Sequence, residues 1–116
     1  MMGLEIEMQE FDKRIILRLE GRLDAATSPV LEKKMNNLLK EGYKDQILDF
    51  SKLDYLSSAG MRLLLSETKK LKAMKGRLVI FSVQEDVMEI LKMAGFERIL
   101  TICNLEQEAL QIFLKP

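Results

Sequence analysis

Apolar and polar residues alternate along two neighbouring stretches near the start of the chain. In Leu4–Gln9 every second residue is apolar, and in Arg14–Gly21 the apolar positions include Ile15, Leu17 and Leu19. A period of two is typical of strands with one buried face. Because only the short segment "EFDK" joins the two stretches, they are predicted to form an antiparallel pair of strands.

Further along the chain the apolar spacing changes to the three-and-four pattern of amphipathic helices, and this pattern occurs four times. Ser28 before Pro29 predicts the cap of the first helix, and Gly42 its end. The apolar faces expected for the four helices are Leu31, Met35, Leu38 and Leu39; Met61, Leu64, Leu65, Thr68 and Leu71; Val87, Ile90, Leu91 and Ala94; and Leu105, Ala109, Ile112 and Phe113.

The later helices also have predicted ends. Gly76 is expected to terminate the second helix and Gly95 the third. A capping box between Ser82 and Glu85 is expected to start the third helix, and "NLEQ" to cap the fourth.

Three further strands are predicted between these helices. They are Asp45–Ser51, Arg77–Ser82, which is apolar almost throughout as in a strand covered on both faces, and a short strand within "ERILTI". Strands that alternate with helices after a hairpin predict right-handed crossovers. The sequence therefore predicts one α/β domain over residues 1–116, with a mixed, mainly parallel sheet of four to five strands and about four helices.

Composition narrows the classes of function. The 116 residues are 47% hydrophobic, enough for a core, and 18 basic residues balance 18 acidic ones. The chain has no basic stripe of the kind that binds nucleic acid, and it has no apolar run long enough for membrane insertion, so neither kind of partner is expected. The single Cys103 is expected to be a packing residue in a reducing compartment. With no signal peptide pattern at the start, a cytoplasmic location is predicted.

Catalysis is not expected. The chain has no histidine, the commonest general base and a frequent metal ligand. It lacks the Gly-x-Ser-x-Gly elbow of hydrolases and the glycine-rich phosphate loops of nucleotide enzymes, although a serine–lysine dyad stays formally open. We therefore predict no catalytic residue, no cofactor and no metal.

Two candidate sites remain. The pair Ser57–Ser58 lies between a predicted strand and a predicted helix, where one hydroxyl should cap the helix and the other should face solvent or a partner. A phosphoryl group there would meet the positive end of the helix dipole. The alternative is that both serines only cap and turn. Asp24 in "GRLDAAT" is expected to be a turn or cap acceptor.

Three segments together resemble a known family: "LEGRLDAATSPVLEKKMNNLL", "ILDFSKLDYLSSAGMRLLL" and "GRLVIFSVQEDVMEILKMAGFERIL". They are similar to the STAS domain, and specifically to the free-standing anti-sigma factor antagonists of bacteria, over roughly Leu4 to Phe113. The most specific elements are "G-x-L-D", "D-Y-L-S-S-A-G-M" and "L-x-x-A-G-F".

The resemblance implies a regulated binding protein. In that family the turn typically contains Asp-Ser-Ser/Thr-Gly, and a kinase that is itself the anti-sigma factor phosphorylates the serine after the Asp. The matching acceptor is Ser58; Ser57 replaces the Asp and becomes a second candidate acceptor, and Ala59 replaces the second Ser or Thr. The implied partner-binding surface comprises Asp24, Ser57, Ser58, Ala59, Gly60, Met61 and Arg62.

The implied partners are an anti-sigma factor serine kinase, which is a histidine-kinase-like ATPase, and a cognate phosphatase. Unphosphorylated protein would bind the kinase and release the sigma factor, whereas phosphorylated protein would dissociate. We expect a monomer or weak dimer. The alternative is a phosphorylation-independent STAS adaptor or structural subunit of a transport or signalling complex.

Overall fold

The structure of the protein is a computed structural model that describes residues 3–114, so the ends of the predicted 1–116 domain lie outside the described residues. No helix in this part of the chain is long and apolar enough to cross a membrane. The elements are β1 (Leu4–Phe11), β2 (Arg14–Leu23), α1 (Ser28–Lys40), β3 (Asp45–Leu56), α2 (Ser58–Ala73), β4 (Arg77–Phe81), α3 (Glu85–Met93), the 3-10 turn η1 (Phe96–Arg98), β5 (Thr101–Cys103) and α4 (Glu106–Leu114).

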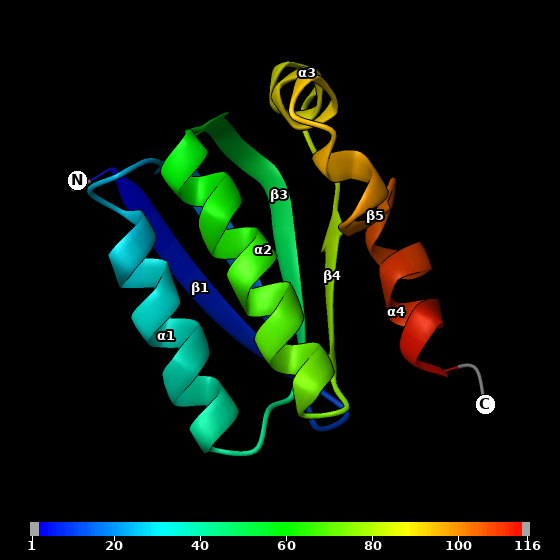
Figure 1. Ribbon diagram of the computed structural model, residues 1–116. Helices are drawn as coiled ribbons and strands as arrows, with labels where there is room; N and C mark the ends of the chain where they lie inside the picture. Colours follow the sequence, from blue (N-terminus) through cyan, green and yellow to red (C-terminus); the bar gives the residue numbers. More distant parts are fainter. Residues whose placement is uncertain (1–2, 115–116) are drawn as a thin grey trace.

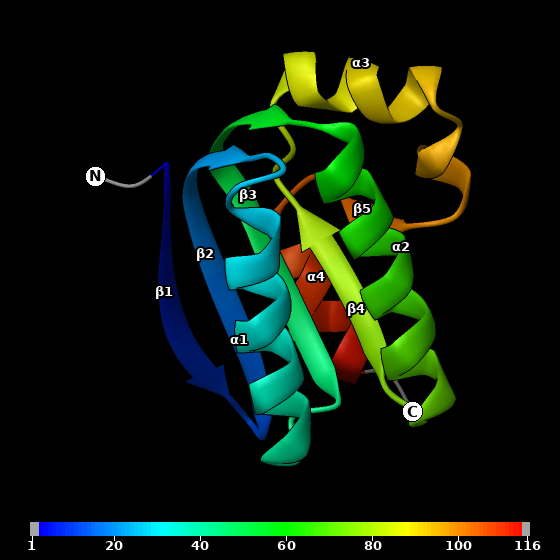
Figure 2. The same cartoon turned by 60° about the vertical axis from the view of Figure 1, so that its left-hand side comes forward.

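The strands form one sheet in the order β1-β2-β3-β4-β5. β1 and β2 are antiparallel, from Leu4 opposite Gly21 to Phe11 opposite Arg14, and the remaining neighbours are parallel. Helices α1 and α2 lie side by side on one face, α4 lies on the other, and α3 crosses the end of the sheet where β2, β3 and β4 finish (Figures 1 and 2). The predicted mixed, mainly parallel α/β sheet is confirmed.

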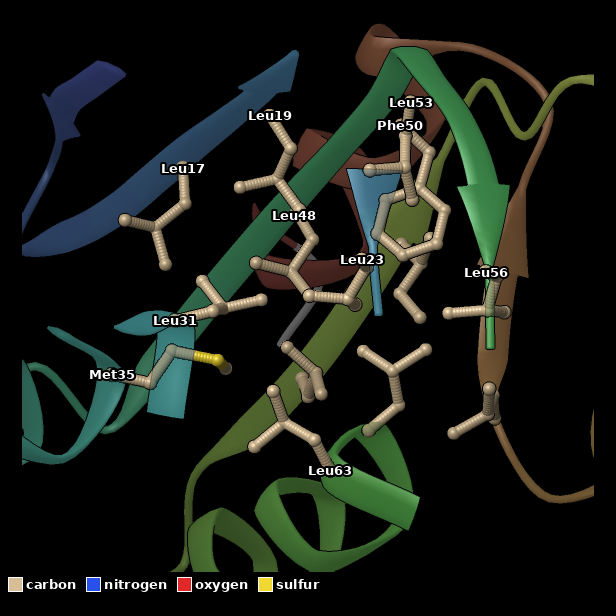
Figure 3. Close-up of a cluster of buried hydrophobic side chains, with 14 of the residues drawn as sticks. Leu17, Leu19, Leu23, Leu31, Met35, Leu48, Phe50, Leu53, Leu56 and Leu63 are labelled. Carbon is tan, nitrogen blue, oxygen red and sulfur yellow. The ribbon is translucent and has the colours of Figure 1, made fainter. Parts of the chain in front are cut away.

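The core has two layers, one on each face of the sheet. The layer beneath α4 contains Ile16, Ile47, Val79 and Phe81, which pack with Ala109. β3 and β4 are therefore covered on both faces, as the unbroken apolar run of β4 predicted. The layer beneath α1 and α2 is larger, and Figure 3 shows Leu17, Leu19, Leu23, Leu48, Phe50, Leu53 and Leu56 of the sheet facing Leu31 and Met35 of α1 and Leu63 of α2.

Several helix boundaries differ from their predictions. Ser28 is the first residue of α1, and the cap position belongs to Thr27. The Thr27 hydroxyl does not cap α1; it donates to the Arg22 carbonyl at 2.8 Å and accepts the Asp24 N–H at 2.9 Å. Gly42, with φ 102°, follows the end of α1 as expected.

The predicted capping box at Ser82 is wrong. Ser82 adopts a left-handed φ of 56°, and its hydroxyl donates to the Asn104 carbonyl at 3.1 Å, so it connects β4 to the segment after β5. The cap position of α3 is Gln84, which makes no side-chain capping hydrogen bond. A tertiary contact therefore takes the hydroxyl that sequence pattern assigned to the helix.

Gly76 also serves a purpose other than the predicted one. The left-handed residue after α2 is Lys75, with φ 63°. A Cβ atom at Gly76 would collide with the Lys44 carbonyl, so this glycine permits the close approach of the α2–β4 and α1–β3 loops.

The C-terminal predictions hold only in part. Within "ERILTI" the first residues form η1, and β5 is limited to Thr101–Cys103. Ala94 and Leu105 are exposed and do not line apolar faces. The "NLEQ" cap is replaced by Glu108, whose Oε1 accepts from the backbone N–H groups of Asn104 and Leu105. Cys103 is half-buried against the α4 layer, and burial raises the pKa of its thiol.

The α1–α2 interface contains a buried carboxylate. Glu67 of α2 is fully buried, and its Oε2 lies 3.0 Å from the ammonium group of Lys70. The Asn36 amide of α1, in the orientation that satisfies both groups, donates to Glu67 Oε1 at 3.1 Å. Burial raises the pKa of the Glu67 carboxyl, and Lys70 opposes this rise. Lys70 therefore lowers the free-energy cost of burying the ionised Glu67 carboxylate.

Removal of that cation should make stability depend more strongly on pH. We expect Lys70→Met to lower the free energy of unfolding by about 1–2 kcal/mol at neutral pH, because Glu67 loses its counter-ion while Lys70 itself is partly screened by solvent. The loss should shrink as the pH falls through the raised pKa of Glu67, since the neutral acid needs no cation. Urea unfolding across a pH series measures this, with the exposed Lys69→Met as control. A loss that is independent of pH would contradict it.

Candidate functional site

The two segments that carry the predicted site residues meet at one edge of the sheet. β2 and β3 are parallel and end in register at Leu23 and Leu56, so Asp24 and Ser57 follow neighbouring strand ends. The Ser57 N–H donates to the Leu23 carbonyl at 2.9 Å, which ties the two strand exits together. The carboxyl edge of a parallel sheet is where α/β proteins commonly place their functional groups.

The two serines have different environments. Ser57 is the N-cap of α2 in an extended conformation, and its Oγ accepts the Gly60 N–H at 3.2 Å. Ser58 is the first residue of α2 and is exposed. As predicted, one hydroxyl caps the helix while the other faces outward.

Gly60 is buried beneath this turn. A Cβ atom there would lie 2.7 Å from Leu56 Cδ1 and 2.9 Å from the Leu23 carbonyl oxygen. Glycine is therefore required because the first turn of α2 rests directly on the end of β2. Gly60 was among the predicted partner-binding residues. Because it is buried, it does not offer a side chain to a partner, and its role is to let α2 pack closely against the end of β2.

Asp24 organises the loop between β2 and α1. Its Oδ1 accepts from the backbone N–H groups of Ala26 and Thr27, each at 3.0 Å, as expected of a turn acceptor. The hydrogen bond from the Thr27 N–H is the main cause that lowers the pKa of the Asp24 carboxyl, and the Arg22 guanidinium adds to it. Asp24 therefore keeps its charge beside the two serines.

Sequence reasoning missed two residues next to Asp24. The guanidinium of Arg22 lies 4.1 Å from the centroid of the Tyr55 ring, and its Nε lies 3.7 Å from Asp24 Oδ2. The sequence contained a signal for both, because Arg22 lies within "GRLD" and Tyr55 within "DYLSS", two segments that resemble the family. The pair braces the strand ends that carry Asp24 and Ser57.

Together these residues form a surface that suits a negative charge. The first turn of α2 has no acidic residue, so the positive end of its helix dipole is not neutralised there, whereas the Asp24 carboxylate lies at the start of α1. We define the Ser58 surface by its accessible members: Ser58 and Arg62, which are exposed, and Asp24, Ser57, Ala59 and Met61, which are half-buried.

The comparisons with known proteins agree with this fold. The family model of the STAS domain matches residues 5–109, nearly the whole chain. The chain belongs to the STAS domain family. Two curated STAS relatives are a candidate anti-sigma factor antagonist, BtrV, of Bordetella bronchiseptica, which is 30% identical over 95% of both chains, and the anti-sigma F factor antagonist of Paenibacillus polymyxa, which is 29% identical over 94% of both.

Solved STAS structures show the same architecture. A candidate anti-sigma factor antagonist of Thermotoga maritima superposes with a TM-score of 0.87, at 19% identity and 95% coverage of both chains. The anti-sigma factor antagonist SpoIIAA in its unphosphorylated form gives 0.81, at 20% identity over 95% of this chain and 96% of the other. Its phosphorylated form, from Bacillus, gives 0.71 at 20% identity, over 96% and 99% of the two chains. At these identities the likeness concerns the fold.

The unequal environments of the two serines can be tested by stability. Ser57→Ala should lower the free energy of unfolding by about 1 kcal/mol, because the Gly60 N–H loses its capping acceptor. Ser58→Ala should change it by less than about 0.5 kcal/mol, since the exposed hydroxyl caps nothing. Urea unfolding of both variants measures the difference. Equal losses would show that the capping role is shared.

The packing of Gly60 gives a second prediction. Gly60→Ala should destabilise the protein by roughly 1–3 kcal/mol, because the added methyl group would press on Leu23 and Leu56 by more than the gain in helix propensity offsets. Thermal unfolding measures this, and Ser58→Ala in the same helical turn is the control. An unchanged or higher melting temperature would contradict the close contact.

Proposed function

We propose that this chain is an anti-sigma factor antagonist that works by partner switching. The unphosphorylated Ser58 surface binds an anti-sigma factor that is also a serine kinase, and phosphorylation of Ser58 releases it. The observation that carries this proposal is the exposed Ser58 hydroxyl at the unneutralised N-terminus of α2. The names of the curated relatives support the same function.

The fold can accept the phosphoryl group. Phosphorylation of serine adds about −1.5 to −2 charges at neutral pH, and such a charge is favourable at a helix N-terminus. Because the Ser58 hydroxyl is exposed and Ser57 provides the cap, the modification breaks none of the capping contacts described above. That SpoIIAA is described in a phosphorylated form with the same fold is in keeping with this.

The added charge disfavours binding to the partner. A dianion in a protein interface loses hydration, and a like charge facing it costs several kcal/mol. Since about 1.4 kcal/mol corresponds to tenfold in affinity, a modest penalty is enough to switch binding off. A cognate phosphatase would restore the binding form.

Ser58 is preferred over Ser57 as the acceptor. The Ser57 hydroxyl accepts the Gly60 N–H, and Ser57 is only half-exposed, so its modification would disturb the start of α2. Ser57 stands where the family typically has a carboxylate. The nearby charge of Asp24, held in its ionised form by the turn, is the remaining carboxylate that a kinase could recognise on this surface.

Binding to the kinase is the direct test. In binding assays with its cognate histidine-kinase-like anti-sigma factor, Ser58→Asp should bind more weakly than the parent by about tenfold or more, because the fixed charge imitates part of the phosphate. Isothermal titration calorimetry measures the affinities. The matched control is Ser51→Asp, which places the same charge at an exposed serine of β3 outside the Ser58 surface. Equal affinity of parent and Ser58→Asp would refute the switch.

The same kinase identifies the acceptor. Incubation with labelled ATP should label the parent and Ser57→Ala, and should not label Ser58→Ala. Label that persists in Ser58→Ala and disappears in Ser57→Ala would move the acceptor to Ser57. A chain that binds no such kinase and takes up no label would instead favour the phosphorylation-independent adaptor.

A further inference from the structure

A groove runs between the N-terminal halves of α1 and α2, beside the Ser58 surface. The two helices lie next to each other on the same face of the sheet (Figures 1 and 2). Ala59, the residue that follows Ser58, is part of the groove wall. Its polar and apolar walls include Ser28 and Glu32 of α1 and Ala59, Arg62, Leu63 and Ser66 of α2.

The Ser28 side chain is the first indication of a ligand. This residue is only 6% exposed, and its hydroxyl oxygen has no hydrogen-bond partner among the residues the structure describes. Buried hydroxyls in folded proteins are nearly always hydrogen-bonded, and an unpaired one reduces stability. A buried, unpaired hydroxyl in the wall of a groove is explained if a bound group supplies the missing partner.

The charges of the groove indicate which kind of group. Arg62 forms no ion pair within residues 3–114, whereas Glu32 lies 3.7 Å from the Lys70 ammonium. The first turn of α2 lacks acidic residues, so its N-terminus adds positive potential. The unpaired charge in this groove is therefore a guanidinium, whose planar fork matches a carboxylate.

We propose that this groove binds a carboxylate side chain, Asp or Glu, of the protein that docks on the Ser58 surface. The Arg62 guanidinium donates to the carboxylate, and the Ser28 hydroxyl donates to it as well. This inference rests on the proposed function, because it names the chemistry of the partner at the same surface. The exposed Pro29 and Val30, with Val30 56% exposed, supply apolar contact beside it.

The position of Arg62 links the groove to phosphorylation. Ser58 precedes Arg62 by four residues on α2, and side chains with this spacing lie on the same helix face. A phosphate on Ser58 would pair with Arg62 and would also repel a carboxylate in the groove. Phosphorylation would thus withdraw the cation and add a like charge at the same place, which sharpens the switch.

A small probe tests the groove without any kinase. We would titrate the 116-residue chain with N-acetyl-glutamate N-methylamide and follow amide and arginine Nε–H signals by NMR. The expected result is a saturable shift of the Ser28, Ala59 and Arg62 signals, with a much smaller effect of the neutral glutamine analogue. Equal effects of the two probes, or no shift of Arg62 up to the solubility of the glutamate probe, would overturn the proposal.

Three variants separate binding from folding. Arg62→Gln should lower the affinity for the glutamate probe by about tenfold, because one charge-assisted pair is lost. Ser28→Ala should also weaken it, yet leave the melting temperature unchanged or higher, because an unpaired buried hydroxyl is removed. Glu32→Gln in the opposite wall is the matched control and should bind the probe at least as well as the parent. Parent-like binding by Arg62→Gln would overturn the assignment.

The link to phosphorylation needs its own comparison. Ser58→Glu should bind the glutamate probe with lower affinity than the neutral Ser58→Gln does, because the new carboxylate competes for Arg62. Equal binding by both variants would overturn the link. A probe that binds while the kinase leaves Ser58 unlabelled would refute the proposed function and keep the groove. If Ser58 is labelled but the probe does not bind, the proposed function is supported and the groove proposal is refuted.

Discussion

The contact between the first turn of α2 and the end of β2 is the constraint on which this site depends. The Leu23 carbonyl accepts the Ser57 N–H, and it lies where any side chain at Gly60 would intrude. Because this contact is tight, Ser57 is held in the capping position and Ser58 is turned outward. The same contact places the strand exit at Leu23, and with it Asp24, beside the two serines.

Polar groups in this protein separate into those that hold the fold and those that face a partner. Glu67 is buried but is paired with Lys70 and lies against Asn36, so it links α1 to α2. Asp24 satisfies two backbone N–H groups. Arg62 and the Ser28 hydroxyl, in contrast, find no such partners in the part of the chain that the structure describes. Unsatisfied groups next to an exposed serine are consistent with the binding surface proposed above.

The order and type of the elements could be predicted, whereas several of their ends could not. Periods of two and of three to four residues are local properties, so the hairpin, the four helices and the buried β4 followed from them. Caps are different, since any Ser or Thr near a helix start offers a suitable hydroxyl. Ser82 satisfies the sequence pattern, yet its hydroxyl bonds to Asn104 across the sheet.

The sequence by itself determined the alternation of strands and helices, the choice of a serine pair at a helix start, and the resemblance to the STAS family, because these depend on neighbouring residues. Only the tertiary structure decided which serine caps α2, because that depends on how close Gly60 lies to Leu23. It also decided that Glu67 is buried with Lys70 and that Ser28 shares a groove with Arg62. Those outcomes require segments distant in the chain to meet, and the distances between them are fixed only by packing of the core.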